Sequence, residues 1–212
     1  LQPIYAHKGV SMITVTVHGA AGHSSDPSLG NNALDTMHSV MGALMTFRQE
    51  LAQQHQHPGF TVNVPTLNLG CMRAGDNPNR ICGHAELQID LRLLPGMDST
   101  AIHRQLEHRC QEAAAGSHTQ LTVDTTYPPV PPFESPADGD LTLTLAELSG
   151  RAPGTVAFGT EAHFLQTLGM QTVVWGPGSI DQAHQPNEYL EHAHIQPAID
   201  TLQRVISRYC QA

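Results

Sequence analysis

The stretch "SMITVTVHG" (residues 11–19) alternates apolar and polar side chains, and the fold of the first half of the chain is inferred outward from it. Ile13, Val15 and Val17 point to one side, whereas the threonines between them point to the other. A period of two residues is typical of a half-buried β-strand.

The sequence that follows this strand predicts a helix and then a second strand. A helix is expected within residues 31–54, with Asn31 or Asn32 as its N-cap. Residues 61–75 predict a strand, and Pro65 within them indicates an edge strand or an irregular start. The helix is predicted from apolar residues that recur at helical spacing, namely Leu34, Met37, Met41, Leu44 and Leu51.

Two further strands and one more helix complete a recognisable order. The turn "GDNPNR" leads into residues 84–94, which alternate cleanly, and residues 120–127 predict the last strand. Between these strands, Asp98 is expected to begin a helix that reaches about Ala114. The order β-α-β-β-α-β is the split βαβ pattern, a ferredoxin-like antiparallel sheet with both helices on one face. We assign this domain to residues 7–127.

The rest of the chain predicts part of an α/β domain. Residues 1–6 and the proline-rich stretch 128–140 are interpreted as linkers. A Gly-rich strand and loop are expected at 154–162, and a second strand at 171–175. The two strands, "TVAFG" and "QTVVW", look fully buried, but they are too few to cover their own apolar faces. Residues 128–212 are therefore expected to belong to a larger α/β sheet. Helices are expected around 140–149 and at the C-terminal end, where an apolar stripe comprises Ile195, Ile199, Leu202 and Ile206.

Composition and charge exclude several classes of protein. The chain has 212 residues, of which 40% are hydrophobic, enough for a folded core. Its formal net charge of −9 disfavours nucleic acids and acidic membrane surfaces as partners. Four widely spaced cysteines without a C-x-x-C pair are typical of free thiols in a reducing cytoplasm. Because the chain begins with Leu1 and "LQPIYAHKG" reads like the middle of a protein, we expect a fragment.

His184 lies in a polar loop, "GPGSIDQAHQPNEYL" (176–190), directly after an apolar strand, where chemistry is common. Neither the G-x-S-x-G elbow of serine hydrolases nor an H-E-x-x-H zinc motif accompanies it. A lone loop histidine is more often a surface residue than a metal ligand. The residues alone therefore make His184 a weak candidate.

Three residues of the domain 7–127 allow both a functional and an ordinary interpretation. His23 lies in the glycine-flanked loop 19–27, which could be a surface turn or could present an imidazole that donates to an anion. Asn79 and Arg92 could bind a substrate carboxylate, the guanidinium with two hydrogen bonds. Spacing alone favours the alternative, in which Arg92 pairs with a neighbouring Asp or Glu on a solvated strand face.

The stretch "FGTEAHF" (158–164) is the last candidate. Backbone N–H groups around Gly159 and Thr160 could cradle an anion, although an ordinary strand end fits equally. Glu161 could serve as a ligand, a substrate contact or a helix cap.

Taken in order, four motifs resemble the dizinc aminoacylase and carboxypeptidase superfamily. They are "GHSSDPSLGNNA", "NPNRICGHAELQIDLRLLPGM", "GTEAHF" and "GPGSIDQAHQPNEYL", and together they extend over essentially the whole chain. Within the superfamily, the motifs are most similar to those of the bacterial acetylornithine deacetylases, and the desuccinylases are more distant.

The resemblance implies an α/β catalytic domain with two zinc ions, for which cobalt can substitute, and an inserted lid that forms a homodimer. Residues 7–127 correspond to the lid and residues 128–212 to the end of the catalytic domain. The family's N-terminal catalytic half, which carries the other zinc ligands and the general base, is expected before Leu1.

The resemblance also implies roles for individual residues. His184 corresponds to a zinc ligand, and His23 to the lid histidine that stabilises the oxyanion in the partner subunit's active site. Four residues correspond to substrate contacts. Glu161 stands where the deacetylase motif has its glutamate and is expected to bind substrate as well, whereas His163 departs from the proline expected at its position. The four contacts are Asn79, Arg92, Gly159 and Thr160.

The implied activity is removal of the acetyl group from N2-acetyl-L-ornithine by a cytoplasmic enzyme of arginine biosynthesis. Two alternatives within the superfamily are deacylation of another N-acyl amino acid and desuccinylation. An alternative of another class is a dimerisation or binding fragment without catalysis, and a third is a histidine-rich metal buffer.

Overall fold

The computed structural model describes residues 1–211, which divide into two compact units. One unit is formed by residues 8–132, and the other by residues 1–7 together with the chain from Phe133 onward. Neither unit includes a helix long and apolar enough to cross a membrane, among the residues described.

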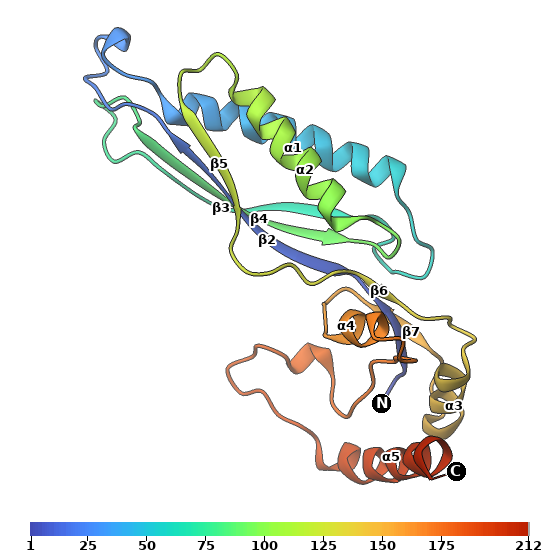
Figure 1. Ribbon diagram of the computed structural model, residues 1–212. Coiled ribbons are helices and arrows are strands. Elements are labelled where there is room, and N and C mark those ends of the chain that lie inside the picture. The colour runs from blue at the N-terminus through green and yellow to red at the C-terminus, as the bar shows by residue number, and fades with distance from the viewer. Residues whose placement is uncertain (212) are drawn as a thin grey trace. The chain divides into compact units, whose positions relative to one another are not determined.

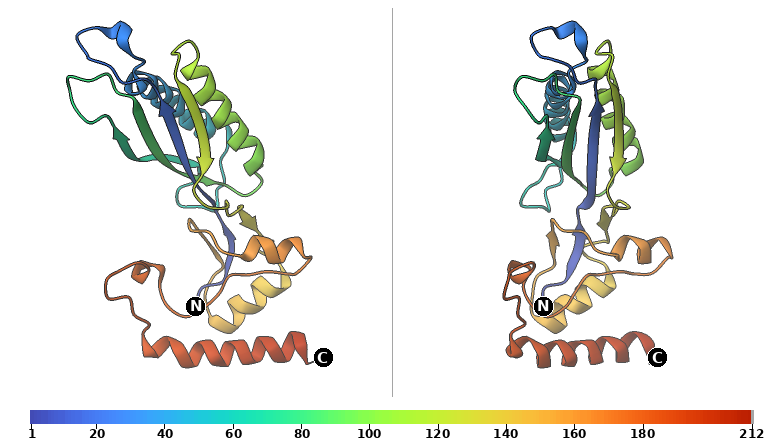
Figure 2. Two further views of the ribbon diagram at one scale, coloured as in Figure 1. Left: turned by 60° about the vertical axis from the view of Figure 1, so that its left-hand side comes forward. Right: turned by 90° about the vertical axis from the view of Figure 1, so that its left-hand side faces the viewer.

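The unit 8–132 is a four-stranded antiparallel sheet with two helices (Figure 1). Its strand order is β3-β4-β2-β5, and α1 and α2 lie side by side on the same face of the sheet (Figures 1 and 2). The predicted split βαβ arrangement is therefore confirmed. The elements are β2 (Gly9–His18), α1 (Ala33–Gln54), β3 (Thr66–Ala74), β4 (His84–Leu93), α2 (Ser99–Ala114) and β5 (Gln120–Thr125).

The core of this unit lies between the sheet and its helices. On β2, Ile13, Val15 and Val17 are buried, as the alternation predicts. Both helices begin at predicted caps, since the Asn32 side chain accepts from the N–H of Leu34, and the Asp98 side chain accepts from two N–H groups of α2. The same face of β4 contributes the buried side chains of Leu87, Ile89, Leu91 and Leu93.

Strand β3 lies at one edge of the sheet and begins at Thr66, directly after Pro65. Residues 61–65, which were expected to extend the strand, lie outside it. Proline lacks the N–H that a ladder requires, so pairing starts only after it. The edge position that Pro65 indicated is confirmed.

The second unit contains a three-stranded sheet of order β6-β1-β7. Strand β1 pairs antiparallel with β6 and parallel with β7. Residues 1–6, expected to be a linker, include most of β1, and the expected linker 128–140 includes β6. Both expectations fail because short strands acquire their partners from distant parts of the chain. The elements are β1 (Ile4–His7), β6 (Phe133–Glu134), α3 (Asp140–Ser149), β7 (Gly154–Val156), α4 (Ala162–Thr167) and α5 (Ile195–Cys210).

The expected strand at 171–175 is reduced to a single bridge, in which Val174 and Ile4 exchange backbone hydrogen bonds. Neither β7 nor residues 171–175 is fully buried, contrary to expectation, because β7 is an edge strand of this small sheet. The apolar stripe of α5 is likewise 40–49% exposed at its four predicted positions. In α5, the buried residues are Ala198 and Thr201.

Cys110 of α2 is completely buried, and this predicts a pH dependence. Burial, with a smaller contribution from Glu107, raises the pKa of its thiol from 9.0 to about 12. In the unfolded chain the thiol ionises near its ordinary pKa, so between pH 9 and 12 unfolding releases a proton and stability falls as pH rises. We expect a slope of about 1.4 kcal/mol per pH unit from this group.

Urea unfolding followed by circular dichroism at several alkaline pH values measures this slope. The Cys110→Ala variant should show a shallower loss of stability than the parent, whereas Cys210→Ala, which removes an exposed thiol, should match the parent. Equal slopes in the parent and Cys110→Ala would contradict the assignment.

Candidate functional site

His23 lies in the loop between β2 and α1, and hydrogen bonding at its Nδ1 orients the imidazole ring. Its Nδ1 accepts a hydrogen bond from the backbone N–H of Ser25 at 3.3 Å and lies 2.7 Å from the Ser25 hydroxyl. Because Nδ1 is an acceptor, the neutral ring carries its proton on Nε2. The exposed imidazole therefore presents an N–H donor to its surroundings.

The loop that carries His23 is attached to the loop that carries Asn79. The N–H of Ser24 donates to the carbonyl of Asn79 at 3.0 Å, and His23 forms a β-bridge with Arg80. Within the loop of His23, the backbone at Gly22 approaches the backbone at Leu29 so closely that a Cβ on Gly22 would lie 2.6 Å from the carbonyl oxygen of Leu29. The structure thus brings His23 and Asn79 together at one end of the sheet.

Arg92 lies at the opposite end of β4. The eight steps along the strand from His84 to Arg92 span roughly 26 Å. The guanidinium makes two hydrogen bonds of 2.7 Å to the carboxylate of Asp90. The structure therefore contains the Arg–Asp pair that the sequence favoured, and it does not bring Arg92 to His23 within one chain.

A buried lysine neighbours Arg92, and sequence reasoning missed it. Lys8 is 2% exposed, and its Nζ donates to the carbonyl of Val64 at 2.7 Å. Burial, and then the charge of Arg92, lowers the pKa of Lys8. The available signal was a lone lysine between two strands, "AHKGV", which is too weak to indicate burial.

Gly159, Thr160 and Glu161 form the loop between β7 and α4. The N–H of Thr160 donates to Nε2 of His7 at 3.3 Å, so the loop lies against the carboxyl end of β1. His7 is fully buried and packs on the ring of Phe133. Since the parallel strands β1 and β7 both end here, the loop occupies the edge where α/β sheets bind ligands. The sequence did not indicate His7, because residues 1–6 were expected to be a linker and residue 7 the start of the domain 7–127, whereas the structure places His7 in β1 of the second unit.

His184 is exposed, in a loop with an unusual backbone. Its φ of 62° is left-handed, which is uncommon for a residue other than glycine and occurs often at functional sites. Its N–H donates to the Glu188 carboxylate at 3.3 Å. The left-handed backbone at His184 and the hydrogen bond to Glu188 therefore fix the position of the His184 Cα and the direction in which its side chain leaves the loop.

Within residues 1–211, no group of three or more His, Cys, Asp and Glu side chains could hold a metal ion. A catalytic zinc ion takes three protein ligands. His184 is a single donor, so the described residues do not form a zinc site by themselves.

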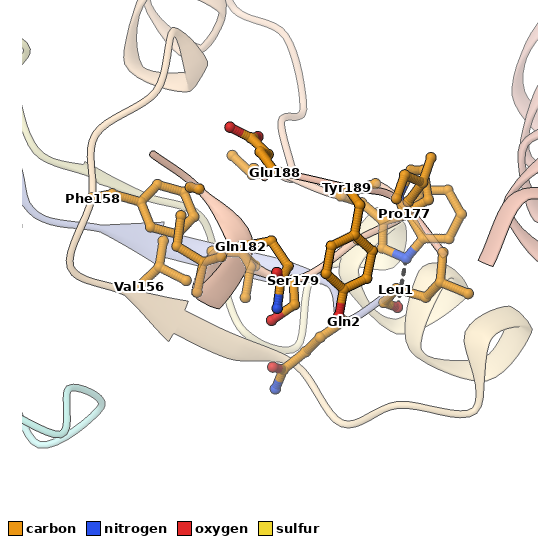
Figure 3. Close-up of a pocket in the computed structure, with 17 residues that line it drawn as sticks. Leu1, Gln2, Val156, Phe158, Pro177, Ser179, Gln182, Glu188 and Tyr189 are labelled. Atoms are coloured by element: carbon orange, nitrogen blue, oxygen red, sulfur yellow. Dashed lines mark hydrogen bonds between the residues drawn. The ribbon is translucent and has the colours of Figure 1, made fainter. Parts of the chain in front are cut away.

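A cavity of about 720 Å³ lies beside the loop of His184 (Figure 3). Val156, Phe158 and Tyr189 give it an apolar lining, and Glu188 and Ser179 add polar groups. The Trp175 indole N–H donates to the carbonyl of Leu1 at 2.7 Å at its wall. Ala183, but not His184, lines the cavity. Residues of the loop 176–190 thus line a cavity that the sequence did not predict.

The chain matches known proteins in sequence. Residues 5–118 match the peptidase dimerisation domain family. The chain is 42% identical over 210 residues to an acetylornithine deacetylase of Aliivibrio fischeri strain MJ11, covering 99% of this chain and 55% of that protein. It is 44% identical to an acetylornithine deacetylase of Vibrio vulnificus strain CMCP6, with the same coverage. The chain spans about half the length of the curated relatives it matches.

Solved structures share the fold at low sequence identity. A tripeptidase from Staphylococcus aureus Mu50 superposes with a TM-score of 0.73 at 17% identity, over 100% of this chain and 54% of that one. The di-peptidase Dug1p of Saccharomyces cerevisiae superposes with a TM-score of 0.72 at 12% identity, over 100% of this chain and 56% of that one. The match to the sequence family covers more than half of the chain and most of the unit 8–132. The chain therefore belongs to the M20 peptidase dimerisation domain family.

Proposed function

We propose that the whole protein is a metal-dependent amidohydrolase that removes the acetyl group from N2-acetyl-L-ornithine, in arginine biosynthesis and in the cytoplasm. In this proposal the unit 8–132 acts as lid and dimerisation domain, and the second unit forms part of the catalytic domain. Identity of 42% to an acetylornithine deacetylase across 99% of the chain supports the substrate. The observation that carries the chemistry is the hydrogen bond from the Ser25 N–H to Nδ1 of His23, which assigns the proton of the neutral ring to Nε2.

His23 stabilises negative charge on the carbonyl oxygen of the substrate. As water adds to the acetyl carbonyl, this oxygen becomes an oxyanion, and a preorganised N–H donor lowers the energy of that state. Ser25 keeps the proton on Nε2, so the ring needs no rearrangement before it donates. Asn79, in the adjoining loop, adds an amide at the same end of the sheet.

The separation of His23 from Arg92 supports a homodimer. A strand length of roughly 26 Å separates Arg92 from His84, at the end of β4 nearer to the loops of His23 and Asn79. One amino-acid substrate cannot span this distance to touch both His23 and Arg92 of one chain. We infer that His23 and Asn79 act on substrate held by the partner subunit, and that Arg92 binds the carboxylate of a different substrate molecule. Asp90 holds the Arg92 guanidinium in position until the carboxylate arrives.

The second unit contributes the remaining groups. The backbone of Gly159 and Thr160 and the carboxylate of Glu161 contact the substrate at the carboxyl end of β7, and His184 serves as one zinc ligand. Zinc, or cobalt in its place, lowers the pKa of bound water. The other metal ligands come from outside residues 1–211, since the described residues contain no group of three donors.

Hydrolysis of N-acetylornithine by the whole protein tests the proposal. N-acetylornithine should be cleaved faster than other N-acetyl amino acids and than N-succinyl substrates. Faster cleavage of one of those would favour the alternative deacylases, and His163, where a proline was expected, is the first residue to examine. No cleavage of any of them would favour a binding module.

A variant of Arg92 tests its part in the same assay. Arg92→Ala removes a charge-assisted interaction worth about 1.5–3 kcal/mol, so we expect KM to rise roughly 10- to 100-fold. Arg73→Ala is the matched control, because Arg73 is an exposed arginine of β3 on the same sheet. An unchanged KM in Arg92→Ala would show that the Arg92–Asp90 pair is only structural.

A further inference from the structure

We propose that His18 and His84 form a two-histidine site for a divalent transition-metal ion, on the open face of the four-stranded sheet. Neither residue belongs to the hydrolytic site proposed above. The inference therefore stands or falls independently of the deacetylase activity.

Strand register places the two histidines directly opposite each other, His18 at the end of β2 and His84 at the start of β4. The N–H of Gly19 donates to the carbonyl of Gly83 at 2.9 Å, so the neighbouring His18–His84 pair is a non-hydrogen-bonded pair. The carbonyl of His84 accepts instead from Gly75, on the β3 side. In such pairs the Cα atoms are only about 4.5 Å apart and the side chains lie close together.

The distance between the rings suits one shared ion. Their centroids are 5.1 Å apart, with an angle of 45° between the planes. With metal–nitrogen distances of about 2.0–2.1 Å, two imidazoles that bind one ion at near-tetrahedral angles have centroids roughly 5 Å apart. An ion can therefore be held by rotation of the side chains, without displacement of either strand.

Both rings are available to a ligand. His18 and His84 are exposed, and across residues 1–211 neither ring makes a side-chain hydrogen bond. The helices cover the opposite face, where Val17 and Ala85 are buried. The ion would thus bind from solvent, on a face that the fold leaves open.

The donor set selects the class of ion. Two imidazoles are supplemented by water, and by the amide of Gln120, which pairs with His18 from β5. Imidazole suits copper, nickel and zinc, whereas magnesium and calcium prefer oxygen ligands. Among the divalent ions, Cu²⁺ should bind most tightly, followed by Ni²⁺ and Zn²⁺.

The position of the pair gives the site a structural consequence. The loop that carries His23 begins at Gly19, directly after His18, and the loop that carries Asn79 ends at Gly83, directly before His84. An ion bound by both histidines joins the bases of the two loops. Amide hydrogen exchange in both loops should therefore slow when the ion binds.

Titration of the whole protein with Cu²⁺ alone tests the site. His18→Ala and His84→Ala should each remove the same single equivalent of bound Cu²⁺, and the double variant should remove no more than either. His38→Ala, which removes another exposed histidine on α1, should keep that equivalent. Electron paramagnetic resonance should detect two imidazole nitrogens in the parent protein and fewer in both single variants.

Two results would overturn the metal site, and a third would overturn its structural consequence. Equal Cu²⁺ stoichiometry in the parent and both single variants would rule out the site, and a loss of two equivalents in the double variant would mean independent surface histidines. Unchanged hydrogen exchange in both loops would remove the structural consequence. If the protein does not cleave N-acetylornithine, the number of Cu²⁺ ions bound per chain should be unaffected. The two proposals can therefore fail separately.

Discussion

Replacing His23 by alanine in the whole protein is expected to lower kcat for N-acetylornithine roughly 10²- to 10³-fold, the usual cost of losing one oxyanion donor. The N–H on Nε2 is aligned before the reaction by Ser25, so its loss removes stabilisation that exists only as charge develops. Because the interaction is made in the transition state, kcat and kcat/KM should fall by the same factor. Steady-state kinetics measures both.

Two control variants make this result specific. Ser25→Ala should cause a smaller loss than His23→Ala, because the backbone N–H of residue 25 still donates to Nδ1. His38→Ala, an exposed histidine of α1 in the same unit, should leave kcat unchanged. A normal kcat in His23→Ala would remove His23 from the catalytic groups, and a large rise in KM instead would make it a substrate-binding residue.

The largest expected effect on stability is that of Phe47→Ala in α1. Phe47 is 1% exposed, and the guanidinium of Arg109 lies 5.1 Å from its ring centroid. Truncation of a buried phenylalanine removes its packing and leaves a cavity, which typically costs 3–5 kcal/mol. In this variant the ion pair of Arg109 with Glu50 would also lose the ring beneath it.

Native-state hydrogen exchange measures the loss within the unit 8–132. The slowest amides of α1 and α2 should exchange with an opening free energy lower by about 3–5 kcal/mol in Phe47→Ala. Met45→Ala is the matched control, because Met45 lies on the exposed side of the same helix, where substitutions change stability by about 0.5 kcal/mol or less. Similar losses in both variants would mean that Phe47 is not a core residue.

The sequence predicted those parts of the fold that depend on local pattern. Alternation at Ile13, Val15 and Val17 identified the buried face of β2, because side chains of a strand point alternately to its two faces. Asp98 identified the start of α2, because a side-chain cap acts within a few residues. Where the pattern was too short to be read, as in Ile4–His7, the prediction failed.

The candidate site was predicted in its residues but not in its arrangement. The motifs singled out His23, Asn79, Arg92 and His184, and their roles stay predictions. The structure adds that His23 and Asn79 share one end of the sheet while Arg92 lies at the other. That division follows from the length of β4, and it supports the site shared between two subunits that the resemblance already implied.

By itself, then, the sequence determined the order of the elements in the unit 8–132, the buried face of its long strands β2 and β4, and the caps of α1 and α2, because each depends on residues close together in the chain. The tertiary structure alone decided the register of the strands, and with it which residues face each other on neighbouring strands. It paired His18 with His84 and brought the N–H of Thr160 to Nε2 of His7. The pairings between distant residues are chosen by the burial of whole faces, a property that no short stretch of the sequence contains.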